Sequence, residues 1–289
     1  MVPREAGRVA TIFRDAFNDL YERRGFGPIV ADESVGRVIA ETYLVHDPDH
    51  CLVVEYDGRL AGSAFLHPRA TVAGIGPVTV DPSLHGRGLG RALVGGLCER
   101  ADRLGIASTR LIQDAFNENS YALYARLGFR PQRVLARASF LPGRGPAVRE
   151  TRVAAAADLA NIAALEEDLL GFSRRRDYEL LRRVGEVLVL DGRGGIEGWA
   201  GRIVRGSVAV LGPVLSRSFE GMRRLVDEGS SELPAGTEIR ILLPAESPEV
   251  LEFLAPRELE VHSLCNYMVR GSFSGIRGHY VPTLFPESG

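Results

Sequence analysis

The sequence of 289 residues contains no lysine, because all 35 of its basic side chains are arginines. Mechanisms that need a lysine for a Schiff base or for phosphate binding are therefore excluded. The three cysteines, Cys51, Cys98 and Cys265, lie far apart and are odd in number, so they match neither a disulfide framework nor the ligand spacing of a metal site. We expect Cys51 and Cys98, which have apolar neighbours, to be buried thiols, and we expect no metal.

A charge excess and long apolar runs are also absent. The net charge of −2 gives no electrostatic reason to expect nucleic acid or an anionic membrane as a partner. The start of the chain carries charges where a signal peptide needs an apolar core, and no stretch approaches the roughly 18 apolar residues of a membrane-spanning helix. We therefore expect a protein of the reducing cytoplasm. Its length is comfortable for two α/β domains.

Hydrophobic periodicity alternates between helical and strand spacing along the first half of the chain. Helices are predicted at Arg4–Phe26, Ser34–His46, Gly90–Leu104 and Ser120–Leu127, and strands at Cys51–Tyr56, Leu60–Leu66, Val72–Val80, Thr109–Gln113 and Arg133–Ser139. This alternation favours an α/β fold with a mixed sheet. The Pro- and Gly-rich stretch Leu141–Pro146 that follows is typical of a linker.

The second half of the chain repeats the first. The segment Val72–Val78 aligns with Val208–Val214 at an offset of 136, and the Asp-Gly-Arg turn at 57–59 recurs at 191–193. A helix at Asp158–Leu170 and a hairpin formed by Val187–Leu190 and Ile196–Ile203 are predicted around these matches. Two similar α/β domains in tandem are the best explanation, and we predict them at residues 1–140 and 148–289.

A glycine-rich loop joins the strand that ends at Val80 to the next helix. Glycines at 86, 88 and 90 remove Cβ atoms, so backbone N–H groups can converge on an anion beside the positive N-terminus of the helix. Arg87 and Arg91 add positive charge. This pattern is typical of a diphosphate site, although a Walker loop needs a lysine and the dinucleotide fingerprint needs the spacing G-x-G-x-x-G. A glycine-rich connection without a ligand is the alternative interpretation.

A second motif lies about 25 residues downstream, where Asn117–Phe129 reads NENSYALYARLGF. Together with the glycine loop it closely resembles the GNAT superfamily of acyl-CoA N-acyltransferases, over roughly residues 5–138. The resemblance implies a two-domain, tandem GNAT-like fold and a loop that holds the diphosphate of acetyl-CoA. The loop residues are His85, Gly86, Arg87, Gly88, Leu89 and Gly90, with His85 at a position where the family usually has Gln or Arg.

The resemblance also implies roles beyond the loop. Backbone groups of Val78 and Val80 would bind the pantetheine arm where this strand splays from the next one, and Asn117 would bond to the same region. Tyr124 would be the general acid that protonates the departing thiolate. The alternatives are a helix N-cap for Asn117 and a core aromatic for Tyr124.

The general base is less clear from the sequence. The strand before the loop, Thr71–Val80, contains no acid at the position where the family usually has one. Asp114, at the end of the next strand, is then the nearest candidate to accept the proton of the attacking amine. A solvated strand end is the alternative for Asp114, and a water relay or an amine that is already neutral would replace its chemistry.

The second half has no equivalent of the glycine loop. Its segment Leu215–Met222 lacks the glycines and carries Phe219 and Glu220, which would crowd or repel a diphosphate. It resembles the degenerate C-terminal domains of tandem GNAT proteins. We therefore expect one acetyl-CoA per chain and transfer of its acetyl group to a primary amine of a small molecule or peptide. An acyl-CoA-binding sensor without turnover and a purely structural tandem protein are the alternatives.

Three histidines outside the loop are interpreted as exposed to solvent. His46 and His50 flank the sequence HDPDH between a helix and a strand, where the spacing does not suit a metal. His67 precedes Pro68 at the end of a predicted strand and is interpreted as a surface residue.

Overall fold

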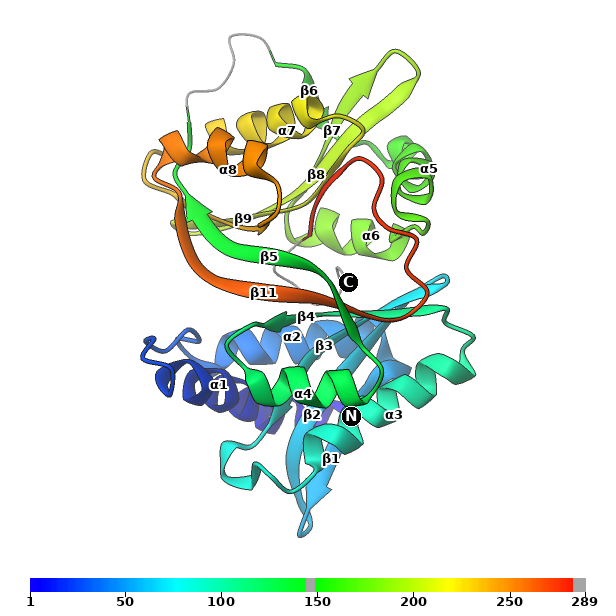
Figure 1. Ribbon diagram of the computed structural model, residues 1–289, viewed down its shortest axis with the longest axis vertical. Helices are drawn as coiled ribbons and strands as arrows, with labels where there is room; N and C mark the ends of the chain where they lie inside the picture. Colours follow the sequence, from blue (N-terminus) through cyan, green and yellow to red (C-terminus); the bar gives the residue numbers. More distant parts are fainter. Residues whose placement is uncertain (144–148, 283–289) are drawn as a thin grey trace. The chain divides into compact units, whose positions relative to one another are not determined.

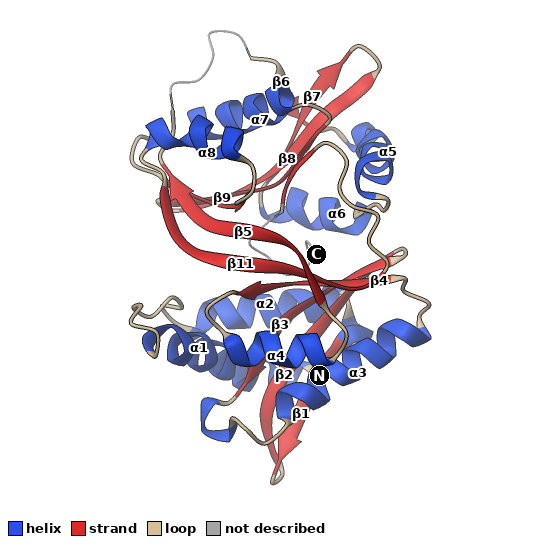
Figure 2. Cartoon of the chain, in the orientation of Figure 1, coloured by secondary structure: helices blue, strands red, loops and turns tan. Residues whose placement is uncertain are grey.

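The computed structural model describes residues 1–143 and 149–282 (Figure 1), so most of the predicted linker lies outside the described residues. The chain divides into two compact units. Of the described residues, unit 1 contains Met1–Arg130 and Val269–Gly271, and unit 2 contains residues 131–143, 149–268 and 272–282. Each unit combines helices with a sheet of parallel and antiparallel strands, which confirms the α/β class (Figure 2).

Unit 1 contains the helices and strands that the hydrophobic periodicity predicts, with ends that differ by a few residues. They are α1 (Ala6–Glu22), α2 (Glu33–His46), β1 (Cys51–Tyr56), β2 (Arg59–Arg69), β3 (Val72–Val80), α3 (Leu89–Arg103), β4 (Ser108–Asp114) and α4 (Glu118–Arg126). The Asp32 side chain caps α2 by accepting a hydrogen bond from the Ser34 N–H at 2.6 Å, as its position before the helix predicts.

Helices cover both faces of the strands in unit 1. Phe65 of β2 packs in a buried cluster with Val9 of α1 and Tyr43 of α2. A Cβ atom on Gly62 would lie 3.2 Å from Leu93 of α3. Because residues 62 and 65 of a strand project to opposite faces, α1 and α2 cover one face of the sheet and α3 covers the other.

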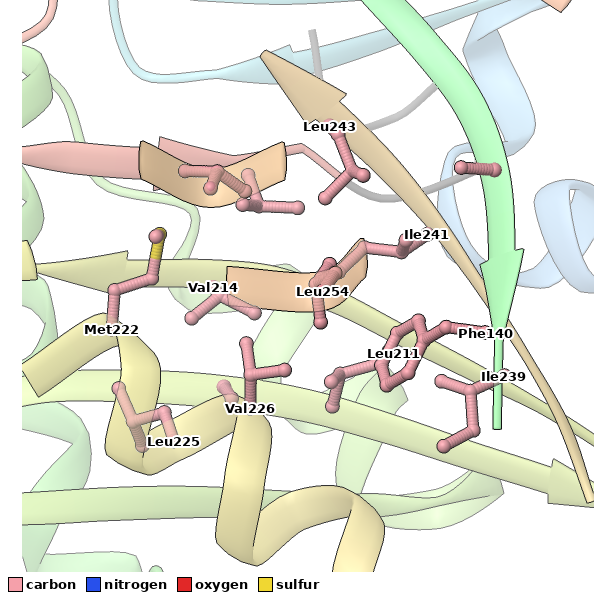
Figure 3. Close-up of a cluster of buried hydrophobic side chains, with 14 of the residues drawn as sticks. Phe140, Leu211, Val214, Met222, Leu225, Val226, Ile239, Ile241, Leu243 and Leu254 are labelled. Atoms are coloured by element: carbon pink, nitrogen blue, oxygen red, sulfur yellow. The ribbon is translucent and has the colours of Figure 1, made fainter. Parts of the chain in front are cut away.

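Unit 2 contains four α-helices among the described residues, and the sequence analysis predicts only the first of them, α5. The elements are β5 (Arg130–Phe140), β6 (Thr151–Val153), α5 (Leu159–Leu170), α6 (Arg175–Val184), β7 (Glu186–Gly192), β8 (Gly195–Arg205), β9 (Val208–Ser216), α7 (Phe219–Ser231), β10 (Glu238–Pro244), α8 (Pro248–Leu254), β11 (Glu260–Gly271) and β12 (His279–Val281). All but the first residue of β5 and the last three of β11 belong to this unit. Strands β5 and β7 to β10 surround a core that includes Phe140, Leu211 and Ile239, with α7 and α8 packed against it (Figure 3).

The units divide the chain differently from the predicted domains. Strand β5, which was assigned to the first domain, lies in unit 2 and pairs antiparallel with β10 from Leu135 to Phe140. The last residues of β11, Val269–Gly271, belong to unit 1 and neighbour β4. There Arg270 forms an ion pair with Asp102 of α3 at 2.8 Å. Periodicity identifies a strand but not its partner, which is why this arrangement does not follow from the sequence.

The β2–β3 pair of unit 1 and the β8–β9 pair of unit 2 have equivalent strand registers. The pairing of β2 with β3 in unit 1 and of β8 with β9 in unit 2 is interrupted at equivalent places, at Gly76 (φ 141°) and Gly212 (φ 140°). The pairs on either side of the interruption correspond at the offset of 136: Ala64 with Val78 and Leu66 with Ile75 in unit 1, Ala200 with Val214 and Arg202 with Leu211 in unit 2. The sequence repeat is therefore also a repeat of backbone geometry.

Candidate active site

The glycine loop leads from β3 into α3 and is exposed from His85 to Gly88. Gly86 (φ 79°) and Gly88 (φ 80°) both have left-handed backbone conformations, which side chains other than glycine rarely adopt. A Cβ atom on either would meet nothing within 4 Å. These two glycines are therefore required by the backbone conformation and not by a lack of space. Leu89, the next residue, is buried and anchors the start of α3.

The N-terminus of α3 is suited to an anion. Its N-cap residue, Gly88, has no side chain, and the first turn contains no acidic residue. The first N–H groups of a helix have no partner within the helix and lie at the positive end of its dipole. Arg87 adds a cation beside them: its guanidinium donates to the Tyr56 hydroxyl at 3.2 Å and lies 5.6 Å from the centre of the Tyr56 ring. The predicted loop residues His85–Gly90 thus lie together around one helix N-terminus.

A slot opens between β3 and β4 next to this loop. The two strands pair in parallel over three residues, Val72–Gly74 with Ser108–Arg110, and then diverge. Strand β3 continues to Val80, still paired with β2 along its other edge. Within the described residues, the β3 edge that carries Val78 and Val80 therefore has no strand beside it on the β4 side. We call this region the unit 1 slot. Its backbone groups are available to an extended ligand, in the way that a free sheet edge is available to another strand.

Helix α4 lies beside the glycine loop. A Cβ atom on Gly90 would be 3.6 Å from Leu123 of α4 and 3.9 Å from Val80, which are ordinary contact distances. Asn117 is the N-cap of α4, and its side-chain oxygen accepts a hydrogen bond from the Ser120 N–H at 3.2 Å. The capping role considered for Asn117 is therefore present, and a contact with pantetheine remains a prediction for its amide group.

Tyr124 of α4 is half-buried and lies near a negative charge. Desolvation and the Asp114 carboxylate together raise the pKa of Tyr124 to about 12, so its phenol stays protonated at neutral pH. The ring contacts Phe129 edge-on, with 6.0 Å between ring centres. Asp114 is half-buried at the end of β4. The structure thus places the predicted proton donor and the predicted base close enough to interact electrostatically.

Strands β2 and β3 also carry polar side chains that the sequence analysis does not identify. Ser63 and Thr79 are buried, and their hydroxyl oxygens are 3.1 Å apart across the two strands. Neither strand contributes an acid at this point, so Asp114 remains the candidate base that the sequence suggests.

The interpretation of His67 as a surface residue was wrong. His67 is fully buried on β2, with Nδ1 3.2 Å from the Asp47 carboxylate and Nε2 2.8 Å from the Gly76 carbonyl oxygen. Arg69 also pairs with Asp47, at 3.1 Å. The segment HDPDH is therefore not simply a solvated turn. The signal in the sequence is the uncharged run of small and apolar residues at 61–66, AGSAFL, directly before His67. An uncharged run of this kind is typical of a strand covered on both faces, and residues 61–67 are all buried.

The cysteines are buried and unbridged, which confirms the expectation for Cys51 and Cys98. Burial raises the pKa of the Cys51 thiol to about 12 and that of Cys98 to about 11. Across residues 1–143 and 149–282, no group of three or more His, Cys, Asp and Glu side chains is arranged to hold a metal ion. No helix in this part of the chain is long and apolar enough to cross a membrane.

Unit 2 has an equivalent slot that is already filled. Strands β9 and β10 pair in parallel over three residues, Val208–Val210 with Glu238–Arg240, and then diverge. Strand β12 occupies the edge that this divergence leaves, because its three residues pair antiparallel with Val214–Ser216. At the offset of 136, Val214 and Ser216 correspond to Val78 and Val80 of unit 1.

The helix that follows the unit 2 slot is capped by the protein itself. The Ser218 hydroxyl accepts a hydrogen bond from the Gly221 N–H at 3.1 Å and donates one to Glu197 at 2.9 Å. Phe219 packs edge-on against Phe253 and lies 5.8 Å, centre to centre, from the ring of His279. The N-terminus of α7 therefore has a side-chain cap, whereas no side chain of residues 1–143 and 149–282 caps that of α3.

Comparison with known proteins agrees with this geometry. Residues 9–129 match the Acetyltransferase (GNAT) family. A mycothiol acetyltransferase from Salinispora tropica is 42% identical over 84 residues, which cover 27% of this chain and 27% of that protein. A glucosamine 6-phosphate N-acetyltransferase from Trypanosoma brucei brucei is 42% identical over 80 residues, which cover 25% of this chain and 52% of that protein. The matched segments thus span about a quarter to a half of these relatives.

Solved structures share the fold along nearly the whole chain. A protein from Pyrococcus horikoshii, provisionally assigned as an acetyltransferase, has a TM-score of 0.80 at 19% identity and covers 100% of this chain and 94% of its own. A GCN5-related N-acetyltransferase from Sphaerobacter thermophilus has a TM-score of 0.63 at 17% identity and covers 96% of each chain. At these identities the likeness concerns the fold.

Proposed function

We propose, from the match of residues 9–129 to the acetyltransferase (GNAT) family of acyltransferases, that this chain transfers an acetyl group from acetyl-CoA to a primary amine of a small molecule or peptide. The observation that carries the proposal is the unit 1 slot, an unpaired strand edge that leads directly to an uncapped helix N-terminus with two left-handed glycines.

The loop and the slot bind different parts of acetyl-CoA in this proposal. Backbone N–H groups of Gly86–Gly90 hold the diphosphate, helped by the α3 dipole and by the charge of Arg87. His85 lies at the rim of the same loop. The amides of the pantetheine arm pair with the β3 edge at Val78 and Val80, and the Asn117 amide bonds to this arm from the start of α4. The thioester then lies between the diverging strands.

The reaction needs two proton transfers at neutral pH. The amine nitrogen attacks the thioester carbonyl carbon, and the carbon–sulfur bond breaks as the amide forms. Asp114 accepts the proton that the amine loses, directly or through a water. Tyr124 donates its proton to the departing sulfur, which a pKa of about 12 permits because the phenol is protonated when the step begins. A thiol has a pKa of only about 8.5, so the thiolate is a tolerable leaving group and its protonation adds a smaller rate gain than it would for a more basic leaving group.

Unit 2 acts as a scaffold in this proposal, as a degenerate GNAT-like domain that does not bind acetyl-CoA. Its filled slot and the Ser218 cap of α7 support this view. The acceptor class rests on the relatives, both of which are named as acetyltransferases and one of which is named for an amino sugar. The three unbridged thiols suit a reaction in the reducing cytoplasm.

The test is thiol release from acetyl-CoA in the presence of a panel of amines, with binding measured in parallel. Turnover with at least one amine is the expected result. Binding without turnover would instead favour an acyl-CoA sensor, an alternative that gains weight because Thr71–Val80 contains no acid. An absence of binding would leave only the structural alternative.

A further inference from the structure

A buried ionic cluster lies directly behind the strand edge that faces the unit 1 slot. His67, Asp47 and Arg69 are each at most 4% exposed. Asp47 ends α2, and its carboxylate receives Arg69 at 3.1 Å and the His67 ring at 3.2 Å. Although burial opposes ionisation of Asp47, the His67 hydrogen bond and the Arg69 charge hold the pKa of this carboxyl well below its usual range. The Asp47 carboxylate is therefore ionised, and it connects the end of α2 to β2.

The other ring nitrogen of His67 reaches across to β3. Nε2 lies 2.8 Å from the carbonyl oxygen of Gly76. Gly76 occupies the interruption between β2 and β3, where the register passes from Ile75 to Val78 without a regular ladder pair. Because a carbonyl oxygen can only accept, Nε2 carries a proton and donates it. Asp47 fixes the ring that makes this bond, and the bonded glycine precedes the edge residue Val78 by two positions.

Unit 2 provides an internal control for this cluster. Gly212 has the same φ as Gly76 within one degree and sits in the same interruption of the ladder. The residue that corresponds to His67 at the offset of 136 is Ile203, a buried apolar side chain that cannot donate to a carbonyl. The interruption thus forms without a histidine. His67 is therefore not required to fold this motif, and it occurs in the unit whose slot is not filled by a strand.

We propose that His67, oriented by Asp47, is a positioning residue that holds the Gly76 carbonyl and so fixes the backbone of Val78 toward the slot. This inference rests on the proposed function, since Val78 belongs to the edge that would align the thioester. In unit 2 strand β12 fixes the corresponding edge by pairing with it. In unit 1 the edge has no such strand, and the hydrogen bond from His67 restrains it from behind. A displacement of even 1 Å at a reacting centre can lower a rate about 100-fold.

The test uses His67→Ile, which installs the residue that unit 2 has at this position, and His67→Gln, whose side-chain amide can still donate to Gly76. Arg69→Met is the matched control, because it also removes a hydrogen-bond partner of Asp47, while Arg69 lies opposite Val72 on β3. The first measurement is the backbone amide resonance of Val78 in the full chain without ligand. We expect it to shift in His67→Ile and to stay near the wild-type position in His67→Gln and Arg69→Met, while the amides of the glycine loop remain unchanged in all three.

The second measurement is the turnover of acetyl-CoA with an accepted amine. We expect kcat to fall about tenfold to a hundredfold in His67→Ile, with KM for acetyl-CoA changed less than about threefold, and to recover in His67→Gln. If His67→Ile does not fold, His67→Asn replaces it, because its shorter amide is directed to Asp47 and falls short of Gly76.

The two claims fail in different ways. A Val78 resonance that shifts equally in the isoleucine and glutamine variants, or in neither, overturns the positioning role even if the wild-type protein is an active acetyltransferase. A kcat that falls only in proportion to the folded fraction overturns it as well. A wild-type protein that does not bind acetyl-CoA removes the proposed function, and the resonance of Val78 still decides whether His67 fixes this backbone.

Discussion

The two units contain the same strand divergence and differ in what lies against it. In unit 1, β3 and β4 part after three pairs, and no strand of the described part of the chain pairs with the freed β3 edge at Val78 and Val80. In unit 2, β9 and β10 part at the equivalent place, and β12 pairs with Val214–Ser216. Backbone N–H and C=O groups need partners when they are buried, so a slot of this kind must be filled by a ligand, by water or by the chain itself. Unit 2 shows that an extended backbone fits it.

The two units also differ in the polarity and size of side chains at equivalent positions of these strands. Ser63 and Thr79 form a buried hydroxyl pair in unit 1, and the corresponding residues in unit 2 are Trp199 and Leu215, both fully buried. Tyr280 of β12 is buried as well, and its hydroxyl accepts a hydrogen bond from Arg174 at 2.9 Å. Unit 2 thus has large apolar side chains at the positions where unit 1 has small polar ones. Among the described residues, the same repeat leaves this strand edge without a paired strand in one copy and pairs it with β12 in the other.

The largest difference between the two units is expected when the proposed anion site of unit 1 is disrupted. Gly88→Val forces a β-branched side chain into a left-handed conformation, so the loop must change shape and the amides cannot converge on a diphosphate. We expect CoA affinity to fall by at least about 100-fold, which corresponds to about 2.7 kcal/mol. Gly105→Val is the matched control: Gly105 follows the other end of α3, has φ 70° and also has open space around its Cβ position. Equal CoA affinity in wild type and Gly88→Val, measured by calorimetry, would remove the main support for the loop.

Removal of the proton donor gives the next largest effect. Tyr124→Phe keeps the ring and its contact with Phe129, so we expect kcat to fall toward the lower end of the usual 10²–10⁴-fold range and acetyl-CoA affinity to change little. Because the pKa of Tyr124 is raised to about 12, the phenol stays protonated up to about pH 10, and its ionisation should not limit kcat below that pH. A drop of tenfold or less, with chemistry shown to limit the rate, would make Tyr124 a packing residue.

Asp114→Asn tests whether Asp114 is the general base. We expect kcat near pH 7 to fall about tenfold to a hundredfold, less than for a strong general base, because alignment of amine and thioester supplies much of the acceleration. The deficit should narrow as pH rises and more of the amine is neutral. Loss of the Asp114 charge should also lower the pKa of Tyr124 toward its ordinary value of about 10, since this carboxylate contributes to raising it. An unchanged kcat together with an unchanged Tyr124 titration would return Asp114 to a solvated strand end.

The smallest effect on acetyl-CoA use is expected from the strand that fills unit 2. Tyr280→Ala removes a buried aromatic side chain and the acceptor of an Arg174 hydrogen bond, so the free energy of unfolding should fall by about 3–5 kcal/mol. CoA affinity and kcat should remain within about twofold, measured where the variant is folded. Tyr280→Phe is the milder partner, with about 1–3 kcal/mol expected for the lost acceptor. A large loss of CoA affinity in Tyr280→Phe would show that unit 2 takes part in binding.

The sequence predicts much of the fold because local signals suffice for its elements. Periodicity and caps locate α1 to α4 and β1 to β4, and the repeat at an offset of 136 reappears in the strand register. Helix α6 was not predicted because its ten residues are mostly charged and only Asp177, Tyr178 and Leu181 are buried. The partner of β5 depends on the tertiary arrangement, and no local pattern encodes it.

The candidate site likewise contains some residues that local motifs predict and others that only packing between elements brings together. Loop and helix residues such as Gly88 and Asn117 belong to short motifs, so the adjacent residues in the sequence predict their local geometry. His67 and Asp47 are 20 positions apart and meet only after β2 packs against the end of α2. Strand β12 is three residues long, and nothing in its sequence indicates that it fills a slot. Contacts made by packing between elements are the part that the sequence does not reveal.

The stoichiometry of acetyl-CoA binding tests most directly whether only the unit 1 slot binds the cofactor. Calorimetric titration of the wild-type chain should give one site per chain, lost in Gly88→Val and kept in Gly105→Val and in Tyr280→Phe. The result that would contradict the account is a second saturable site of similar affinity, or a single site that survives Gly88→Val and disappears when Ser216–Gly221 is altered. Either outcome would show that the filled slot of unit 2 can open to a cofactor.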